Sequence, residues 1–213
     1  MKRKLIFEVE TATKFRNRFL KAIDEKKCFL ITKDFRAKAV LIPVSEFEDI
    51  YSDKKVSLIL LGAKKCSEKT AKKTITEINK AKFFSKVVFV YGYLTKKYIN
   101  FFNVPDLRII LNKKGYLPII TSLKLGITSL SEKDQFAIFS FLSKPVSSKV
   151  FYKIAKKISS VKEGIVIPLK NQKPTHPVAI SKKFFRKIIS LRKELGIPYL
   201  IRKFKKDIHY IAI

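Results

Sequence analysis

Cysteine is scarce in this 213-residue chain, and long apolar runs are absent. The two cysteines, Cys28 and Cys66, provide neither a disulfide framework nor the spacing of a metal site. The longest mostly apolar runs, residues 56–63 and 136–142, are far shorter than the roughly 20 residues that cross a bilayer. Only three apolar residues follow the basic start at residues 1–4, so we expect no signal peptide. These absences predict a reduced, cytoplasmic protein.

Acidic residues are also few. The chain has 17 Asp and Glu against 47 Lys and Arg, which gives a net charge of +30. Residues 1–53 hold 12 Lys or Arg and 9 Asp or Glu, so +27 of that charge follows residue 53. Such a field attracts polyanions, namely nucleic acid, nucleotides or acidic lipid headgroups. The alternative is a composition bias that writes Lys on every solvated surface, and composition alone leaves both explanations open.

The chain has no internal repeat, no low-complexity tract, and no legible Ser-His-Asp triad, metal-ligand cluster or P-loop. What it does have, after residue 54, is apolar strand-like runs that alternate with amphipathic helical segments. This alternation predicts βα units around a mostly parallel, three-layer sheet, and the 46% hydrophobic content suffices for its core. The predicted strands are residues 56–61, 87–91, 107–111, 136–142, 164–169 and 207–213. The predicted helices are residues 72–84, 95–102, 122–130, 147–158, 181–191 and 198–204.

The first fifty residues have a different pattern, with short elements and balanced charge. The predicted strands are residues 5–9, 28–32 and 38–43, the last two joined by residues 33–37; the predicted helices run from Thr11 or Thr13 to about residue 23 and over residues 44–50. Residues 52–55, Ser-Asp-Lys-Lys, are predicted to link this part to the second part of the chain.

Residues 31–48 contain an Ile-Thr turn, then Ala-Val-Leu-Ile, and then an acidic helix with the aromatic Phe47. This order resembles that of the prevent-host-death (Phd/YefM) antitoxins, and the resemblance covers about residues 5–50. It implies a small α+β antitoxin-like module over residues 1–52. Members of this family dimerise through their sheet and bind operator DNA with their N-terminal region, so the resemblance implies a homodimer.

The same resemblance places Lys14, Arg16 and Arg18 near a DNA backbone, although a solvated helix face is the alternative for each of them. The family's turn glycine is Phe35 here, which makes a turn with positive φ costly. The family's toxin-neutralising tail is missing, and a second domain begins in its place. The sequence therefore does not identify a toxin partner.

Residues 54–213 contain a series of landmarks in the order of one enzyme family. They are a strand followed by Gly92, Asn112 after the next strand, Ser122-Leu-Lys-Leu-Gly126, the strand and Pro of residues 139–145, Thr175-His-Pro-Val178, and Phe184-Phe185. Together they resemble the molybdenum-cofactor nucleotidyltransferases, the MobA-like molybdopterin cytidylyltransferases and guanylyltransferases. The resemblance implies a Rossmann-like nucleotidyltransferase domain over residues 54–213.

The departures from this family concentrate where its chemistry takes place. Ser143 stands at the position of the Asp that holds the family's catalytic metal, and a neutral hydroxyl is a poor ligand for Mg²⁺. Lys144 adds a cation beside that position. Asp134 precedes the strand, at the wrong end to replace the lost ligand. No catalytic residue is therefore assigned.

The resemblance still assigns residues to the two sides of a cleft. The family's glycine-rich phosphate loop corresponds to residues 60–69, where one glycine remains. The nucleotide-binding candidates are Gly62, Lys64, Lys65, Lys69, Asn112 and Ser122, and the substrate-side candidate is His176. The alternatives are surface lysines, helix or turn capping by Asn and Ser, and a histidine that orders its loop.

We therefore expect a nucleotidyltransferase-like protein with impaired catalysis that binds nucleotide or nucleic acid, and the sequence alone assigns it no definite cofactor. One alternative is an active enzyme of the molybdopterin-cofactor type, which would use Mg²⁺ with a nucleoside triphosphate. Another is a regulator that senses a nucleotide and binds DNA. The N-terminal phenylalanines are more apolar surface than a lone module of this size can bury, so residues 1–52 should form a homodimer or pack on their own second domain.

Overall fold

The computed structural model describes the backbone of residues 7–11, 28–33 and 36–41, and residues 56–114, 118–161, 163–192 and 197–213. The chain divides into two compact units, Met1–Asp53 and Lys54–Ile213, and each is described by itself. Among the helices within these ranges, none combines the length and apolar character that crossing a membrane requires.

The first unit contains a three-stranded sheet in the order β1-β2-β3. β1 (Phe7–Thr11) pairs in parallel with β2 (Cys28–Lys33), and β2 pairs antiparallel with β3 (Arg36–Leu41). β1 begins two residues later than the expected strand 5–9. β3 begins two residues earlier than the expected strand 38–43, and β2 ends one residue later than expected, so two residues join β2 and β3 rather than five. The reason is that Lys33 and Arg36 still pair across the ladder.

Several predictions fall outside the described residues of this unit. They concern the helices expected near residues 11–23 and 44–50, the cations Lys14, Arg16 and Arg18, and the turn residue Phe35. The antitoxin-like character of residues 1–52 and the homodimer therefore stay predictions.

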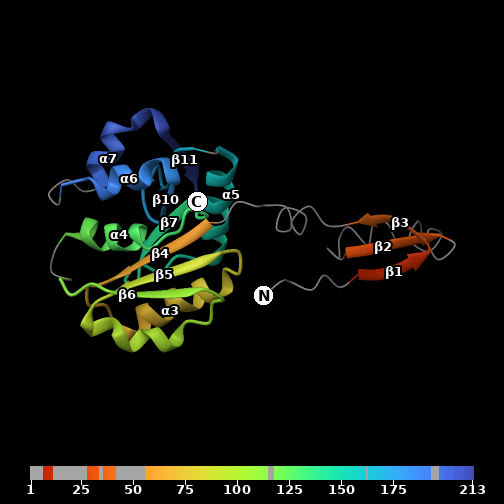
Figure 1. Cartoon of the computed structure of the whole chain (residues 1–213), viewed down its shortest axis with the longest axis horizontal. Helices are drawn as coiled ribbons and strands as arrows, with labels where there is room; N and C mark the ends of the chain where they lie inside the picture. Colours follow the sequence, from red (N-terminus) through yellow and green to blue (C-terminus); the bar gives the residue numbers. More distant parts are fainter. Residues whose placement is uncertain are drawn as a thin grey trace. The chain divides into compact units, whose positions relative to one another are not determined.

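The second unit is a three-layer α/β domain around one mixed, largely parallel sheet (Figure 1). The strand order is β11-β8-β10-β7-β4-β5-β6, and β9 pairs with β8 at the margin. The pairs β4–β5, β4–β7, β5–β6 and β8–β11 are parallel. The strands are β4 (Val56–Gly62), β5 (Lys86–Tyr91), β6 (Leu107–Leu111), β7 (Phe136–Phe141), β8 (Ile165–Lys170), β9 (Lys173–Pro174), β10 (Val178–Ser181) and β11 (Ile208–Ala212).

β10 is the main departure from the expected topology. It lies antiparallel between β7 and β8, whereas the sequence analysis placed no strand there. Its four residues are all buried, so they show no alternation, and the run is too short to be distinguished from a loop. β8 turns back into β9 through Asn171 (φ 49°) and Gln172 (φ 61°), the left-handed pair that a tight hairpin requires.

Helices cover both faces of the sheet. One face is covered by α3 (Glu68–Lys80), α5 (Ser148–Val161) and the 3₁₀ segment η1 (Tyr93–Phe101). The other face is covered by α4 (Ile119–Thr128) and α6 (Phe185–Ile189). The short segment η2 (Lys182–Phe184) precedes α6 in the chain, and α7 (Ile197–Lys203) and η3 (Lys205–Asp207) follow it. Residues 95–102 and 181–191 were predicted as helices; the first forms the 3₁₀ segment η1, and the second is divided between η2 and α6. Periodic apolar positions alone do not separate a 3₁₀ turn from an α-helix.

The sequence of α3 shows why this helix begins and where it packs. Ser67 caps it by accepting a hydrogen bond from the Thr70 amide at 3.2 Å. Ala71, Ile75 and Ile78 then recur at helical spacing and are buried against the sheet. The helix therefore starts four residues earlier than the apolar pattern predicted, because its first turn is polar and exposed.

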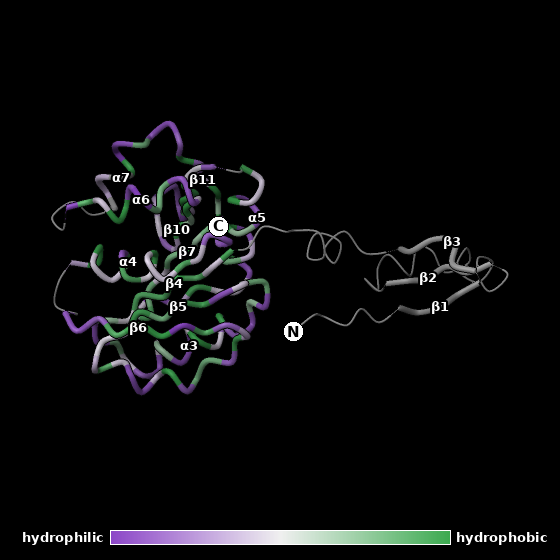
Figure 2. Tube along the Cα trace, in the orientation of Figure 1, coloured by the Kyte–Doolittle hydropathy of each residue, from purple (hydrophilic) through white to green (hydrophobic). Residues whose placement is uncertain are grey.

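The centre of the sheet is fully buried, as a parallel strand between two helical layers should be. All seven residues of β4 are buried. Leu58 and Leu60 contribute to the core under α3 and α5, while Ile59 and Leu61 contribute to the core under α4 and α6. Figure 2 shows apolar colours along β4, β5 and β7, whereas the helices alternate between hydrophilic and apolar colours.

Candidate functional site

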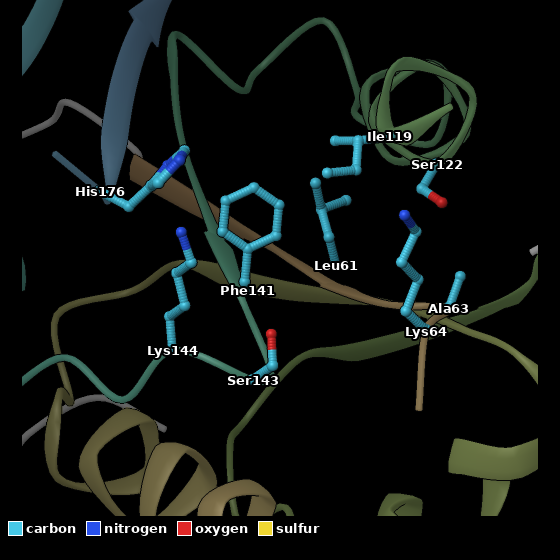
Figure 3. A pocket seen from close by; sticks show the side chains of 9 residues that line it. All are labelled: Leu61, Ala63, Lys64, Ile119, Ser122, Phe141, Ser143, Lys144 and His176. Atoms are coloured by element: carbon cyan, nitrogen blue, oxygen red, sulfur yellow. The ribbon is translucent and has the colours of Figure 1, made fainter. Parts of the chain in front are cut away.

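A pocket of about 220 Å³ lies at the carboxyl edge of the parallel strands (Figure 3). β4, β5, β6 and β7 all end at this edge, and the residues that follow β4 and β7 turn into the pocket. This is where ligands bind in open α/β sheets. The pocket is lined by Leu61, Ala63, Lys64, Ile119, Ser122, Phe141, Ser143, Lys144 and His176.

Two lysines give the pocket its charge. Lys64 follows β4 and points toward Ser122, whereas Lys144 follows β7 and points toward His176 (Figure 3). The Lys144 Nζ lies 5.5 Å from the centroid of the Phe141 ring. Among the described residues, neither lysine has a carboxylate within ion-pair distance. The pocket therefore offers two unneutralised cations to a ligand.

The pocket does not fit the divalent metal that its sequence resemblance implies. Ser143 lies exposed in the turn after β7 and contributes only a neutral hydroxyl. No carboxylate lines the pocket, and the described part of the chain has no group of three or more His, Cys, Asp or Glu that could hold a metal ion. Mg²⁺ needs anionic oxygen ligands, and the two lysines would repel it.

Asp134 lies at the opposite edge of the sheet, as its place in the sequence predicted. It precedes β7 and is 2% exposed. Its carboxylate accepts hydrogen bonds from Ser57 Oγ at 2.5 Å, Lys86 Nζ at 3.0 Å, and the amide and hydroxyl of Ser131 at 2.6 Å each. Burial raises the pKa of Asp134, but these hydrogen bonds outweigh it and bring the pKa to about 2. Asp134 therefore ties the amino ends of β4, β5 and β7 together.

Asn112 and Ser122, two of the predicted nucleotide-binding residues, lie ten residues apart in the sequence and are in contact in the structure. Asn112 Nδ2 donates to Ser122 Oγ at 2.8 Å, and Asn112 Oδ1 accepts from the Lys114 amide at 2.9 Å. Both side chains are buried, and only Ser122 lines the pocket. By accepting the hydrogen bond from the Lys114 amide, Asn112 caps a turn, which is the alternative to nucleotide binding that the sequence left open for it. Ser122 lies inside α4 and not at its start, since the cap of α4 is Pro118.

His176 forms one wall of the pocket. Its ring meets Phe141 edge-on, with the centroids 4.4 Å apart. Its Nδ1 atom is buried and has no hydrogen-bond partner among the described residues. Burial, and secondly the nearby charge of Lys144, lower the pKa of His176 to about 4. The imidazole is therefore neutral at pH 7, and the charge of the pocket comes from its lysines.

This depressed pKa predicts that the protein loses stability in mild acid. An unfolded histidine titrates near pH 6.5, whereas folded His176 does so near pH 4. Between these values the unfolded chain binds the extra proton, so the free energy of unfolding falls as the pH is lowered. Because the ring is partly exposed, we expect a loss of about 1–2 kcal/mol. Urea unfolding should give His176→Gln a flatter pH profile than wild type or His209→Gln, and equal slopes would contradict the prediction.

The other predicted loop residues lie outside the pocket lining. Gly62 is buried at the end of β4, where a Cβ atom would come within 2.4 Å of Phe89 Cε2. Its carbonyl accepts a hydrogen bond from Thr95 Oγ1 at 2.6 Å. Lys65 and Lys69 are exposed and do not line the pocket. The glycine at position 62 thus has a packing reason, whether or not it also serves a ligand.

Besides the small Ala63, the sequence analysis missed three larger lining residues, namely Leu61, Ile119 and Phe141. They form an apolar surface between the two lysines (Figure 3). A signal for two of them was available: Leu61 and Phe141 are the last side chains on the α4 face of neighbouring parallel strands and pair with each other in register. Ile119 carried no comparable signal, because the start of α4 was predicted three residues late.

Taken together, the strand order, the two helical layers and a pocket at this edge define a nucleotidyltransferase-like fold for residues 56–213. Solved structures support this class. They include Rv0371c from Mycobacterium tuberculosis H37Rv (11% identity, 76% of this chain and 89% of that chain, TM-score 0.63) and 4-diphosphocytidyl-2C-methyl-D-erythritol synthase from Anaerococcus prevotii (14%, 75% and 87%, TM-score 0.61). A Methanothermobacter nucleotidyl transferase is also similar (12%, 74% and 87%, TM-score 0.56).

At these identities the likeness establishes the fold and no more. No protein-family model matches the chain, and neither does any curated protein sequence. Rv0371c has also been solved in complex with manganese. The function of the present chain must therefore be argued from its own pocket.

Proposed function

We propose that the second unit binds a nucleotide in the pocket at the carboxyl edge without a metal ion, and that it does not transfer the nucleotidyl group. The observation that supports this most directly is the lining itself, which has two lysines and two serines but no carboxylate. A nucleotidyl-transfer enzyme uses a metal to neutralise the charge that develops on the phosphates. Here Lys64 and Lys144 provide fixed positive charge instead.

The geometry gives the pocket a cation on either side and an apolar surface between them. Phosphate oxygens fit beside Lys64 and Lys144, with the hydroxyls of Ser122 and Ser143 as additional hydrogen-bond donors. Leu61, Ile119 and Phe141 provide the surface for a base or another flat apolar group. A volume of about 220 Å³ is less than a whole nucleotide needs, so part of the ligand must extend into solvent.

The lysines give the proposal a direct test. Lys64→Gln and Lys144→Gln should each weaken binding of a nucleoside triphosphate by roughly tenfold, because each removes one charge-assisted contact to phosphate. Lys65→Gln removes the same charge from the neighbouring exposed position and should leave the affinity nearly unchanged. Calorimetric titration with CTP and GTP, with Mg²⁺ and with EDTA, measures both effects.

Two outcomes would argue against this function. If EDTA abolished binding, the metal-free pocket would be wrong. If the unmodified chain released pyrophosphate from CTP or GTP in a Mg²⁺-dependent way with a molybdopterin acceptor, the active-enzyme alternative would replace it. We expect neither, and Ser143→Asp alone should not introduce turnover, since Lys64 and Lys144 would remain.

For the first unit, we propose the antitoxin-like module over residues 1–52 and a homodimer formed through it. The support is the sequence resemblance together with the six phenylalanines of that segment. Light scattering should give a dimer for the whole chain and a monomer for a chain that starts at residue 54. A monomeric whole chain would leave only the alternative, in which residues 1–52 pack on their own second domain.

A further inference from the structure

A second set of hollows lies on the surface formed by α6, α7 and η3, on elements that contribute nothing to the pocket described above. One hollow, of about 440 Å³, is lined by Lys187, Ser190, Leu191, Arg192, Tyr199, Lys203 and Phe204. The other, of about 520 Å³, is lined by Lys203, Phe204, Lys205, Lys206 and Asp207. They share Lys203 and Phe204, so they adjoin. We call the two together the α6–α7 groove.

The α6–α7 groove keeps its positive charge. Its lining contains five cations and one carboxylate, Asp207, which already pairs with Lys183 at 3.4 Å. Among the residues that the structure describes, none of the five has a carboxylate within ion-pair distance. Lys182 and Lys183, just before α6, do have such partners. Lys182 Nζ lies 2.5 Å from Glu132 Oε2, and Lys183 Nζ lies 3.2 Å from Glu163 Oε2. Figure 2 shows hydrophilic colours along the segment that follows α7.

Aromatic rings stand among these cations. Phe204 packs edge-on against the buried Phe184, with the centroids 5.3 Å apart, which fixes its place in the wall. Lys187 Nζ lies 4.2 Å from the Phe204 centroid, and Lys203 Nζ lies 5.7 Å from the centroid of Tyr199. These cation–π contacts hold the ammonium groups along the groove. Phe204 is anchored in this way, whereas Tyr199 is partly exposed and offers its ring to a ligand.

We propose that the α6–α7 groove binds single-stranded nucleic acid, with phosphates along Lys187, Arg192 and Lys203 and one base stacked on Tyr199. Cations that follow a backbone and an aromatic platform for a base are the two components of such sites. Two adjoining hollows fit successive units of a polymer better than one small anion. A duplex keeps its bases stacked inside, so it could use the cations but not Tyr199. The proposal does not depend on nucleotide binding in the pocket.

The test uses the whole chain and a short fluorescently labelled oligouridylate, titrated at several salt concentrations. Arg192→Gln with Lys203→Gln should reduce the slope of log affinity against log salt by about 1.4, since each phosphate contact to a single strand contributes about 0.7. The matched control is Lys170→Gln with Lys173→Gln, which removes the same charge from exposed positions on the β8–β9 hairpin and should leave the slope unchanged.

Tyr199 separates single strands from polyanions in general. Tyr199→Leu should weaken oligouridylate binding by about 5- to 150-fold with the salt slope retained, and Tyr199→Phe should restore it, because stacking needs the ring and not the hydroxyl. Thermal unfolding of each variant checks that the fold is intact. The corresponding duplex should bind more weakly and should not respond to Tyr199→Leu.

Three results would overturn the proposal. One is equal loss in the control pair Lys170→Gln with Lys173→Gln, which would mean that only the overall charge matters. Another is unchanged oligouridylate affinity in a folded Tyr199→Leu. The third is a duplex that binds as tightly as the single strand, which would make the groove a contact for double-stranded backbone.

Discussion

Replacing Asp134 with alanine is expected to lower the free energy of unfolding by about 3–5 kcal/mol, since removing one partner of a buried ion pair leaves the other charge uncompensated. The remaining charge is Lys86, whose side chain is 8% exposed and whose Nζ lies 3.0 Å from the Asp134 carboxylate. The same substitution also removes the acceptor of the Ser57 hydroxyl and of the Ser131 amide. Urea unfolding measures the loss.

Asp106 provides the control for this prediction. It lies near the same end of the sheet, just before β6, but it is exposed, so Asp106→Ala should cost no more than about 0.5 kcal/mol. The pH profile gives a second check. Because folding lowers the pKa of Asp134 from 3.8 to about 2, its contribution is complete above pH 4 and is lost as the pH falls toward 2. Equal unfolding midpoints for the two variants would contradict the role assigned to Asp134.

The central strands and helices of the second unit could be predicted because their local and global preferences agree. β4 is apolar except for Ser57 and is buried on both faces, and β6 has the predicted bounds, Leu107–Leu111. α5 keeps its apolar residues at helical spacing, with Phe151, Ile154 and Ile158 buried. In these segments the pattern of the chain and the layers of the fold impose the same requirement.

The remaining parts depend on contacts between distant residues, which no local pattern carries. β10 is a strand only because β7 and β8 flank it on both sides. Asp134 was recognised as lying at the wrong edge for a metal, but its bonds to Ser57 and Lys86 join residues 77 and 48 positions away. Likewise, the surface near Tyr199 takes its character from α6 and η3, which lie on either side of it in the sequence.

Part of the candidate pocket could be predicted from the sequence, and part of it could not. Ser143 and Lys144 could be placed because they follow a strand, and Ser122 because it lies in the first turns of a helix, at the edge of the sheet where the fold brings such positions together. Gly62 ends β4 at this edge but is buried, and Phe89 fills the space that a side chain at this position would need. This burial follows from packing, which the sequence pattern did not show.

The double substitution Ser143→Asp with Lys144→Ser should convert the pocket from metal-free to metal-dependent nucleotide binding. It replaces a cation with a neutral group and adds a carboxylate, a change of two unit charges beside the phosphates. At an effective dielectric constant between those of surface and bulk, each charge is worth about 1–2 kcal/mol, so the affinity for a nucleoside triphosphate in EDTA should fall by roughly a hundredfold. Mg²⁺ should recover much of the loss, because the new carboxylate gives the ion an anionic ligand.

The same charge change can be made a few residues away as a control. Ser147→Asp with Lys149→Ser alters the start of α5, where Ser147 does not line the pocket and where Asp is also a good capping residue. This variant should bind the triphosphate with nearly wild-type affinity, with or without Mg²⁺. If both double variants lost affinity equally, the general positive field of the domain and not Lys144 would hold the phosphates. If neither did, the nucleotide would bind elsewhere, since the pocket could not lose two unit charges beside a phosphate without effect.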